Sequence, residues 1–195
     1  MEDLQKFFFK PSCIEDIITF LKEIKPKKIN ILGAGSNTLI RDGGVKGITL
    51  KLGSPFSYLN LVSPNIIEAG AATLDKKIAE FGLQHSLTGL EFLSCIPGSI
   101  GGAIRMNSGC YSEDISKILH SIEVIDMLGK EKNILASDIK FYYRDSSLDQ
   151  NLLITSVKLK GKVSSKELIQ KKQQFLIGKK KKISTKSNKN LWKYL

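Results

Sequence analysis

The chain has 195 residues, of which 42% are hydrophobic and 25% are charged. This composition is typical of a globular protein with one large domain or two small ones, and it excludes a wholly disordered chain. Thirty basic residues stand against 19 acidic ones, and the resulting net charge of +11 first suggests a partner such as nucleic acid.

The distribution of the charge argues against that partner. Residues 166–195 hold ten Lys and one acidic residue, whereas residues 1–165 hold 20 basic and 18 acidic residues. The excess therefore belongs to one end of the chain, and we expect no nucleic-acid partner. Only three basic residues are Arg, which marks Arg41, Arg105 and Arg144 as positions that need a planar, bidentate side chain.

Other simple counts narrow the class of protein further. Cys13, Cys95 and Cys110 form no CxxC pair, which favours a reducing compartment. The first residues lack the apolar stretch of a signal peptide, and no segment is apolar enough to span a bilayer. We therefore expect a cytoplasmic protein without a membrane partner. His85 and His120 have no neighbours at ligand spacing, so we expect no metal site.

Apolar spacing and turn residues predict elements along most of the chain. Ser12 and Glu15 have the spacing of a capping box before a helix, Thr73 precedes another helix, and Ser164 and Glu167 repeat the box. The predicted elements, in chain order, are a helix over 14–25, strands over 28–32, 47–52 and 65–69, helices over 74–81 and 91–95, a hairpin of 121–127 with 131–135, a strand over 152–160 and a helix from about 165 to 176. This irregular mixture predicts an α+β fold.

The pattern stops near residue 178, where a Lys-rich segment begins. We predict that residues 178–195 form a disordered tail.

Two glycine-containing segments are candidate phosphate-binding loops. The first follows a predicted strand, reads Gly33-Ala34-Gly35-Ser36-Asn37-Thr38-Leu39, and is followed by a turn rather than a helix. The second is the segment from Pro97 to Ala103, whose glycines and small residues make it poorly suited to a hydrophobic core or to a helix. Glycines let a backbone approach a phosphate closely, and two such loops suit a dinucleotide. A tight turn and a ligand-free connection remain the alternatives.

Two further segments combine Arg with other polar side chains. Arg105, Asn107 and Tyr111 follow the second loop, and could contact a phosphorylated ligand. Arg144 follows three aromatic residues and precedes Asp145, where it could stabilise a developing carboxylate or enolate charge. For each Arg, a local ion pair is the alternative.

Three other residues near these loops have simpler interpretations. Cys95 and Cys110 are the size of buried packing residues. Glu91 could contact a ligand, or it could be a buried carboxylate that caps the neighbouring loop.

Taken together, three segments resemble the UDP-N-acetylenolpyruvoylglucosamine reductase family of flavoenzymes. They are LGAGSNTLIRDGGVKGITLKLG over 32–53, GLEFLSCIPGSIGGAIRMNSGCY over 89–111 and FYYRDSSL over 141–148. The resemblance runs from about residue 8 to about residue 176 with order and spacing kept.

The resemblance implies the FAD-binding fold of the vanillyl-alcohol-oxidase type, with two α+β subdomains over residues 1–53 and 54–177. It also implies that Arg144 is the active-site arginine, and that Arg105 and Tyr111 are weaker candidates for substrate contact. The cofactor-binding residues implied are Gly33, Ala34, Gly35, Ser36, Asn37, Thr38, Leu39, Ala71, Pro97, Gly98, Ser99, Gly101, Gly102, Ala103, Asn107 and Gly109.

The implied reaction is the reduction of UDP-N-acetylglucosamine enolpyruvate to UDP-N-acetylmuramate in peptidoglycan precursor synthesis. NADPH reduces FAD, and the reduced flavin then reduces the enolpyruvyl group, which a serine protonates.

The sequence also departs from the family. A glycine loop before residue 1 and a third, substrate-binding domain after about residue 177 have no match, and neither do the proton-donor serine and the catalytic glutamate. We therefore expect an incomplete or inactive form of the reductase. The alternative is an FAD-binding module that needs a separately encoded C-terminal piece.

Overall fold

The computed structural model describes residues 7–24 and 28–191, with side chains up to residue 180, and it confirms the α+β class. Two sheets organise the described chain. A small parallel sheet has the order β1-β3-β2, and a five-stranded antiparallel sheet has the order β10-β9-β13-β5-β4. The small sheet lies within residues 7–50, and the large one within residues 59–160.

The large sheet is centred on β13 (Leu153–Lys160), which pairs with β9 (Leu119–Ile125) on one side and β5 (Ile66–Gly70) on the other. Most residues of β13 are buried, including Thr155 and Ser156, as expected for the central strand of a covered sheet. The hairpin of β9 with β10 (Glu131–Leu135) is confirmed. Its turn is held by Asp126, which accepts hydrogen bonds from the backbone N–H groups of Leu128 and Lys130. β4 (Leu59–Ser63) forms the other edge.

The main hydrophobic core lies between this sheet and the helices that follow β5. α2 (Asp75–Gln84) buries Ile78 and Ala79, and α3 (Ile100–Arg105) buries Ile100 and Ile104. The 3-10 helix η2 (Glu91–Cys95) confirms the short helix predicted there. Short elements complete this part of the chain: η1 (Ser54–Phe56), β6 (Leu87–Thr88), β7 (Gly109–Cys110), β8 (Glu113–Asp114), η3 (Ile115–Lys117), η4 (Ala136–Asp138), β11 (Phe141–Tyr142), β12 (Asp145–Ser146) and β14 (Lys162–Val163).

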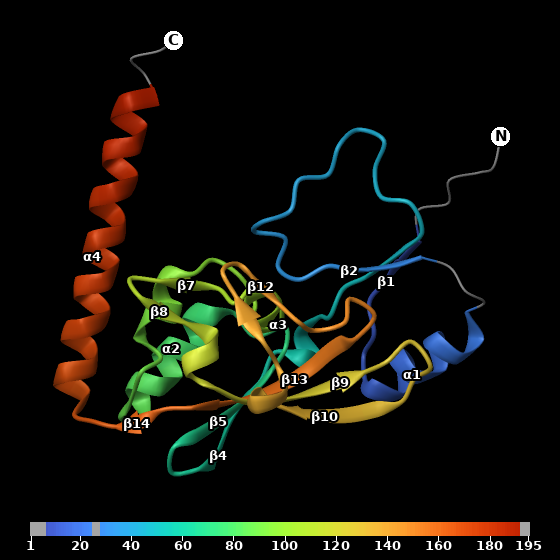
Figure 1. Cartoon of the computed structure of the whole chain (residues 1–195), viewed down its shortest axis with the longest axis horizontal. Coiled ribbons are helices and arrows are strands. Elements are labelled where there is room, and N and C mark those ends of the chain that lie inside the picture. The colour runs from blue at the N-terminus through green and yellow to red at the C-terminus, as the bar shows by residue number, and fades with distance from the viewer. Residues whose placement is uncertain (1–6, 25–27, 192–195) are drawn as a thin grey trace.

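A second hydrophobic core joins the small sheet to the large one. That sheet consists of β1 (Phe7–Phe9), β2 (Ile29–Ile31) and β3 (Ile48–Leu50). Ile17 and Leu21 of α1 (Ile14–Glu23) are buried beside Leu50 and next to Ile125 and Leu153, which end β9 and begin β13. Figure 1 shows α1 at the end of the molecule opposite α4, with the long connection from β2 to β3 arching above the sheet.

The predicted capping residues do not act as expected at the first two helices. Cys13 and Leu74 precede α1 and α2, and neither helix has a side-chain cap. Asp16, rather than Glu15, accepts the N–H of Ser12 at 2.8 Å. The Thr73 hydroxyl donates to the carbonyl oxygen of Tyr58 at 3.0 Å, since it faces the neighbouring strand β4 and the turn before it.

The Lys-rich end departs from the prediction of a disordered tail. α4 spans Lys166–Leu191, so the prediction of disorder from residue 178 onward is wrong for residues 178–191, which are helical. Lys is a good helix former, and no proline follows Gly178 to stop the helix. Residues 192–195 of the predicted tail lie outside the described residues.

The first half of α4 is anchored to the body by polar contacts. Glu91 is 1% exposed and accepts hydrogen bonds from the Thr88 hydroxyl and, at 2.9 Å, from the N–H of Gly89. Lys172 of α4 lies 3.1 Å from the same carboxylate, and Gln173 donates to Ala79 on α2. Burial opposes the charge of Glu91, but the Thr88 hydroxyl and Lys172 outweigh burial and hold its pKa below the usual value. The interpretation of Glu91 as a buried loop cap is therefore confirmed.

We predict that Glu91→Ala lowers the free energy of unfolding by about 2–4 kcal/mol near neutral pH, because the Gly89 N–H loses its partner in a buried place. Since the folded pKa of Glu91 is lowered, this difference should shrink as the pH falls through that pKa. Urea unfolding at two pH values measures both effects. Glu80→Ala removes an exposed carboxylate paired with Lys76 and is the control. An equal loss in the two variants would contradict the prediction.

Candidate cofactor cleft

The first predicted loop leaves β2 without starting a helix. The N–H of Leu32 donates to Leu50 at 2.9 Å, and this bond ends the pairing of β2 with β3. Gly35 then takes a φ of +81°, a conformation that L side chains rarely adopt. The prediction that a turn rather than a helix follows this strand is therefore confirmed.

The second predicted loop is partly helical. Ile100, Ala103 and Ile104 are buried on one side of α3, so the expectation of poor helix and poor core is wrong for this segment. Its glycines serve close packing, because a Cβ on Gly101 would come within 3.0 Å of the Ala71 Cβ. Local composition suggested a loop, and tertiary contact with β5 and the turn after it produced a short helix instead.

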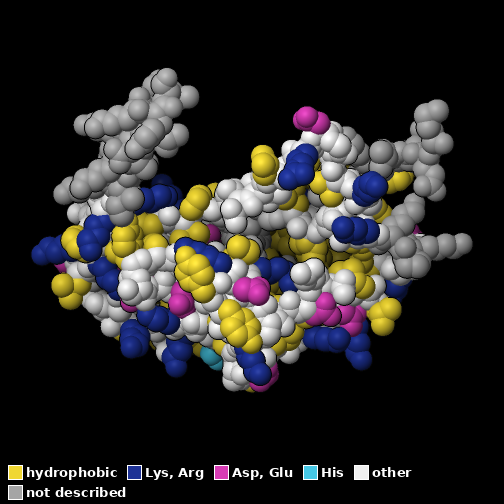
Figure 2. All heavy atoms as spheres, turned by 45° about the horizontal axis from the view of Figure 1, so that its top comes forward, with side chains coloured by type: hydrophobic (Ala, Val, Ile, Leu, Met, Phe, Trp, Pro, Cys, Tyr) yellow, Lys and Arg dark blue, Asp and Glu magenta, His cyan; other side chains and the backbone are white. Residues whose placement is uncertain are grey.

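A hydrogen bond joins the two segments across 61 residues of chain. The Ser36 hydroxyl donates to the carbonyl oxygen of Pro97 at 2.6 Å. The two glycine segments, far apart in sequence, therefore meet and line one cleft of about 670 Å³. Figure 2 shows that this face of the molecule is hollowed near its centre, with hydrophobic and basic side chains around the hollow.

Most of the predicted site residues line this cleft. They are Gly33, Ala34, Gly35, Ser36, Asn37, Thr38, Pro97, Gly98, Ser99, Gly102, Ala103, Arg105, Gly109, Tyr111 and Arg144. Ala71 and Gly101 line an adjoining cavity of about 370 Å³. Leu39 and Asn107 line neither cavity, and Leu39 is 91% exposed.

Asn107 instead supports the wall that carries Arg144. Its side-chain amide donates to Tyr142 at 3.1 Å and accepts the N–H of Ser116 at 3.1 Å. The backbone of Asn107 has a φ of +38°. These contacts tie the end of α3 to the segment that precedes Arg144.

Arg144 points its charge at the cleft without a counter-charge. Its guanidinium donates to the carbonyl oxygen of Gly109 at 3.1 Å and lies 5.5 Å from the centre of the Tyr143 ring. No carboxylate of the described residues pairs with it, and Asp145 accepts the N–H of Ser146 instead. The alternative of an Arg144–Asp145 ion pair is therefore wrong. The φ of +59° at Arg144 is unusual for a non-glycine residue and is typical of a functional position.

Arg105 is occupied by main-chain carbonyls. It donates to Asp149 at 2.9 Å, to Leu148 at 3.5 Å and to Leu152. These bonds hold the connection between β12 and β13 against α3. The predicted contact of Arg105 with substrate stays a prediction.

The glycines of the cleft fit a ligand that approaches the backbone. A Cβ on Gly102 would have only the Ser99 hydroxyl, at 3.9 Å, within 4 Å, and one on Gly35 would meet nothing. Any side chain at position 102 would therefore project into the open cleft. The residues present fit the diphosphate of a dinucleotide such as FAD, whose oxygens accept hydrogen bonds from backbone N–H groups.

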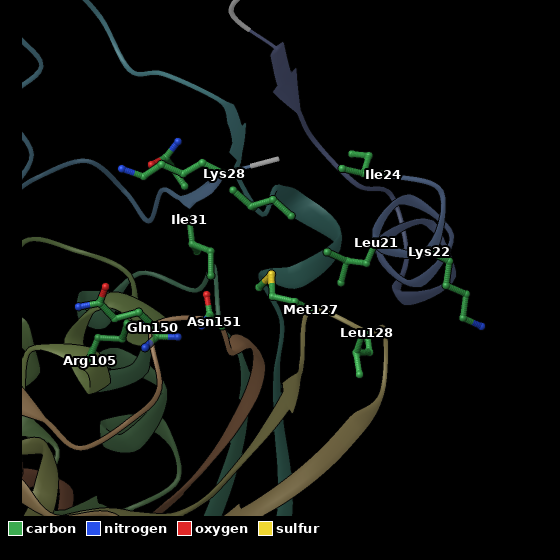
Figure 3. Close-up of a pocket in the computed structure, with 12 residues that line it drawn as sticks. Leu21, Lys22, Ile24, Lys28, Ile31, Arg105, Met127, Leu128, Gln150 and Asn151 are labelled. Carbon is green, nitrogen blue, oxygen red and sulfur yellow. The ribbon is translucent and has the colours of Figure 1, made fainter. Parts of the chain in front are cut away.

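A larger cavity lies elsewhere. About 1050 Å³ in volume, it is lined by residues of α1 and β2, by the β9–β10 turn and by Gln150 and Asn151 (Figure 3). It shares Ile31 and Arg105 with the cleft, but none of the glycine segments lines it. The chemistry needed for a dinucleotide is in the smaller cleft, and we assign the candidate site there.

Comparison with known proteins agrees with this assignment. Residues 6–134 match the model of a family described as "FAD binding domain". The chain belongs to this FAD binding domain family. The match, together with the relatives below, confirms the fold predicted from the resemblance.

Curated relatives carry the name of the reductase family identified from the motifs. The chain is 44% identical over 166 residues to the UDP-N-acetylenolpyruvoylglucosamine reductase of Pelagibacter ubique, covering 85% of this chain and 55% of the relative. It is 43% identical over 175 residues to that of Orientia tsutsugamushi, covering 88% and 58%. The chain thus spans a little over half the length of these relatives.

A solved structure is also similar. The UDP-N-acetylenolpyruvylglucosamine reductase of Thermus caldophilus superposes with a TM-score of 0.80 at 28% identity, over 89% of this chain and 62% of that one. The resemblance to the reductase family is therefore confirmed in sequence and in fold.

The described residues offer neither a metal site nor a membrane span. No group of three or more His, Cys, Asp or Glu residues could hold a metal ion in the part of the chain that the structure describes. None of the helices described there is long and apolar enough to cross a membrane.

One cleft residue of this FAD binding domain was missed by the sequence. Asp75 begins α2, is fully buried, and neither of its carboxylate oxygens has a hydrogen-bond partner among the described residues. It lies beneath Gly98, on which a Cβ would come within 3.2 Å of Oδ2. Burial raises the pKa of Asp75 to about 7. An acidic residue in a first helical turn is so ordinary that no sequence signal distinguishes this one.

We predict that Asp75→Asn stabilises the cofactor-free protein at about pH 8 and has little effect near pH 4. The folded protein holds the Asp75 proton more tightly than the unfolded chain does, so this residue costs stability as the pH rises from about 4 to about 7. We expect the variant to raise Tm by roughly 3–8 °C at the higher pH. Thermal unfolding of wild type and variant at the two pH values measures this, with Glu80→Gln on the same helix as control. A Tm difference that does not change with pH would contradict the prediction.

Proposed function

We propose that this chain binds FAD in the cleft and takes part in the NADPH-dependent reduction of UDP-N-acetylglucosamine enolpyruvate to UDP-N-acetylmuramate. The observation that carries the proposal is the meeting of two glycine segments through Ser36 and Pro97, beside an Arg144 that pairs with no carboxylate in the described part of the chain. The names of the relatives support the same chemistry.

The residues of the cleft would have separate roles. Backbone N–H groups of the 33–38 and 97–103 segments would hold the FAD diphosphate, and the Ser36 and Ser99 hydroxyls lie beside them. FAD, when bound, supplies the hydride that reduces the substrate. Arg144 would bind the enolpyruvyl carboxylate and stabilise the negative charge that develops next to it. Its fixed position, set by Gly109 and Tyr143, lowers the cost of orienting that charge.

We also propose that the protein acts in the cytoplasm, since its three cysteines are free thiols.

The decisive experiment is to purify the chain, titrate it with FAD, and follow the change in flavin absorbance and fluorescence. NADPH oxidation that depends on the enolpyruvyl substrate then tests the reaction. FAD binding with turnover supports the full proposal. Binding with turnover only after addition of a separately expressed C-terminal segment from a relative would identify a cofactor-binding module. Absence of FAD binding would overturn the proposal.

We predict that Gly102→Val weakens FAD binding by at least about 100-fold while the protein stays folded. The new side chain would occupy the cleft, where only Ser99 lies near, and the loss of a well-packed ligand contact costs several kcal/mol. Gly178→Val is the matched control, because Gly178 is also helical and has open space around it. Flavin titration measures affinity, and circular dichroism checks the fold. Normal affinity in Gly102→Val would show that FAD does not use this cleft.

We predict that Arg144→Lys leaves the affinity for FAD within about threefold of wild type but lowers the affinity for the enolpyruvyl substrate by about 10-fold or more. Lys cannot make the bidentate contact with a carboxylate that a guanidinium makes. Titration of the substrate into FAD-loaded protein, read from the flavin spectrum, measures the difference. A loss confined to FAD affinity would contradict the assigned role.

A further inference from the structure

A second cation reaches the cleft from α4. Lys180 lines the cleft together with Arg144, and its ammonium donates to the carbonyl oxygen of Cys95 at 2.9 Å. The place of Lys180 depends on the contacts that anchor α4, since Lys172 pairs with Glu91 and Gln173 bonds to Ala79. Lys179, the neighbouring residue, lies 4.3 Å from the ring centre of Phe175 and 5.7 Å from that of Tyr111. The helix therefore brings a charge to the cleft by its packing.

The two cations line the same cleft and lie near the same thiol. Burial, followed by the nearby Cys95, raises the pKa of the Cys110 thiol to about 11, while Lys180 and Arg144 both act on this thiol in the opposite direction. Both positive charges thus lie within electrostatic range of the same side chain. Cys110 follows Gly109, the residue whose carbonyl oxygen accepts from Arg144.

The donors of these two groups are largely unused. An ammonium has three N–H donors and a guanidinium has five, and one hydrogen bond of each is accounted for, to Cys95 and to Gly109. No carboxylate of the described residues pairs with either group. Two cations that line one cleft without a counter-charge among the described residues repel each other, and an anion bound by both removes that cost.

We propose that Lys180 and Arg144 together form an anion-binding site at this end of the cleft, in which Lys180 binds phosphate or carboxylate oxygens of the bound ligand. The proposal rests on the proposed function and adds a ligand-binding residue from α4. The anion is either the carboxylate of the enolpyruvyl group, the diphosphate of the UDP-sugar or the diphosphate of FAD. All three present the same chemistry to an ammonium group.

The test compares Lys180→Met and Lys180→Arg with wild type. Lys171→Met, on an exposed part of the same helix, is the matched control. Three ligands are titrated by flavin fluorescence or absorbance: FAD into the apo protein, and UDP-N-acetylglucosamine and its enolpyruvate into the FAD-loaded protein. We expect Lys180→Met to lower the affinity for at least one of these ligands by about 5- to 20-fold, and Lys180→Arg to bring that affinity back to within about threefold of wild type. Added salt should lower the affinity for that ligand more in wild type than in Lys180→Met.

The pattern of losses identifies the anion. A loss for the enolpyruvate alone assigns the carboxylate, an equal loss for both UDP-sugars assigns their diphosphate, and a loss for FAD assigns the cofactor diphosphate. The inference is overturned if wild type binds FAD but Lys180→Met changes the affinity of no ligand, or if Lys171→Met gives the same loss. Failure of wild type to bind FAD would instead overturn the proposed function, and the inference with it.

Discussion

The hydrogen bond from Ser36 to Pro97 is the contact on which the cleft depends. It connects a loop that leaves the small parallel sheet to the segment that enters α3, and so it brings the two glycine segments together. A backbone can line a cleft closely only where side chains are absent, which is why Gly35 and Gly102 have open space at their Cβ positions. The second hydrophobic core holds the two sheets in the arrangement that this bond requires.

Around the cleft, polar side chains support the main chain rather than one another. Arg105 donates to carbonyl oxygens between β12 and β13, and Asn107 bonds to the backbone of Ser116 and of Tyr142. Glu91 does the same for the Thr88–Gly89 turn and also receives Lys172 from α4. Arg144 and Lys180, by contrast, pair with no carboxylate of the described residues and keep unused donors in the cleft.

The sequence predicted the large elements well because each has a strong local pattern. The strand over 152–160, the hairpin and the short helix at 91–95 match the structure, and most of the predicted cofactor residues line one cleft. It failed where tertiary contact overrides composition. The glycine-rich segment after Pro97 became α3 because Ile100 and Ile104 are buried there, and Thr73 bonds to Tyr58 instead of capping α2. Asp75 gave no signal, because only the packing beneath Gly98 isolates its carboxyl group.

By itself, the sequence determined the family, since it carries three motifs in the family's order and spacing. The glycines in these motifs mark positions where the backbone needs a conformation or a close approach that other residues disfavour. The sequence also made Arg144 the candidate for stabilising negative charge, because three aromatic residues precede it and its segment resembles the motif that carries the family's active-site arginine. Only the tertiary structure decided which groups share a site. Ser36 meets Pro97, and Lys180 meets Cys95, through contacts that span 61 and 85 residues of chain. Such encounters depend on how α4 and the two sheets pack, and no local pattern of residues specifies that packing.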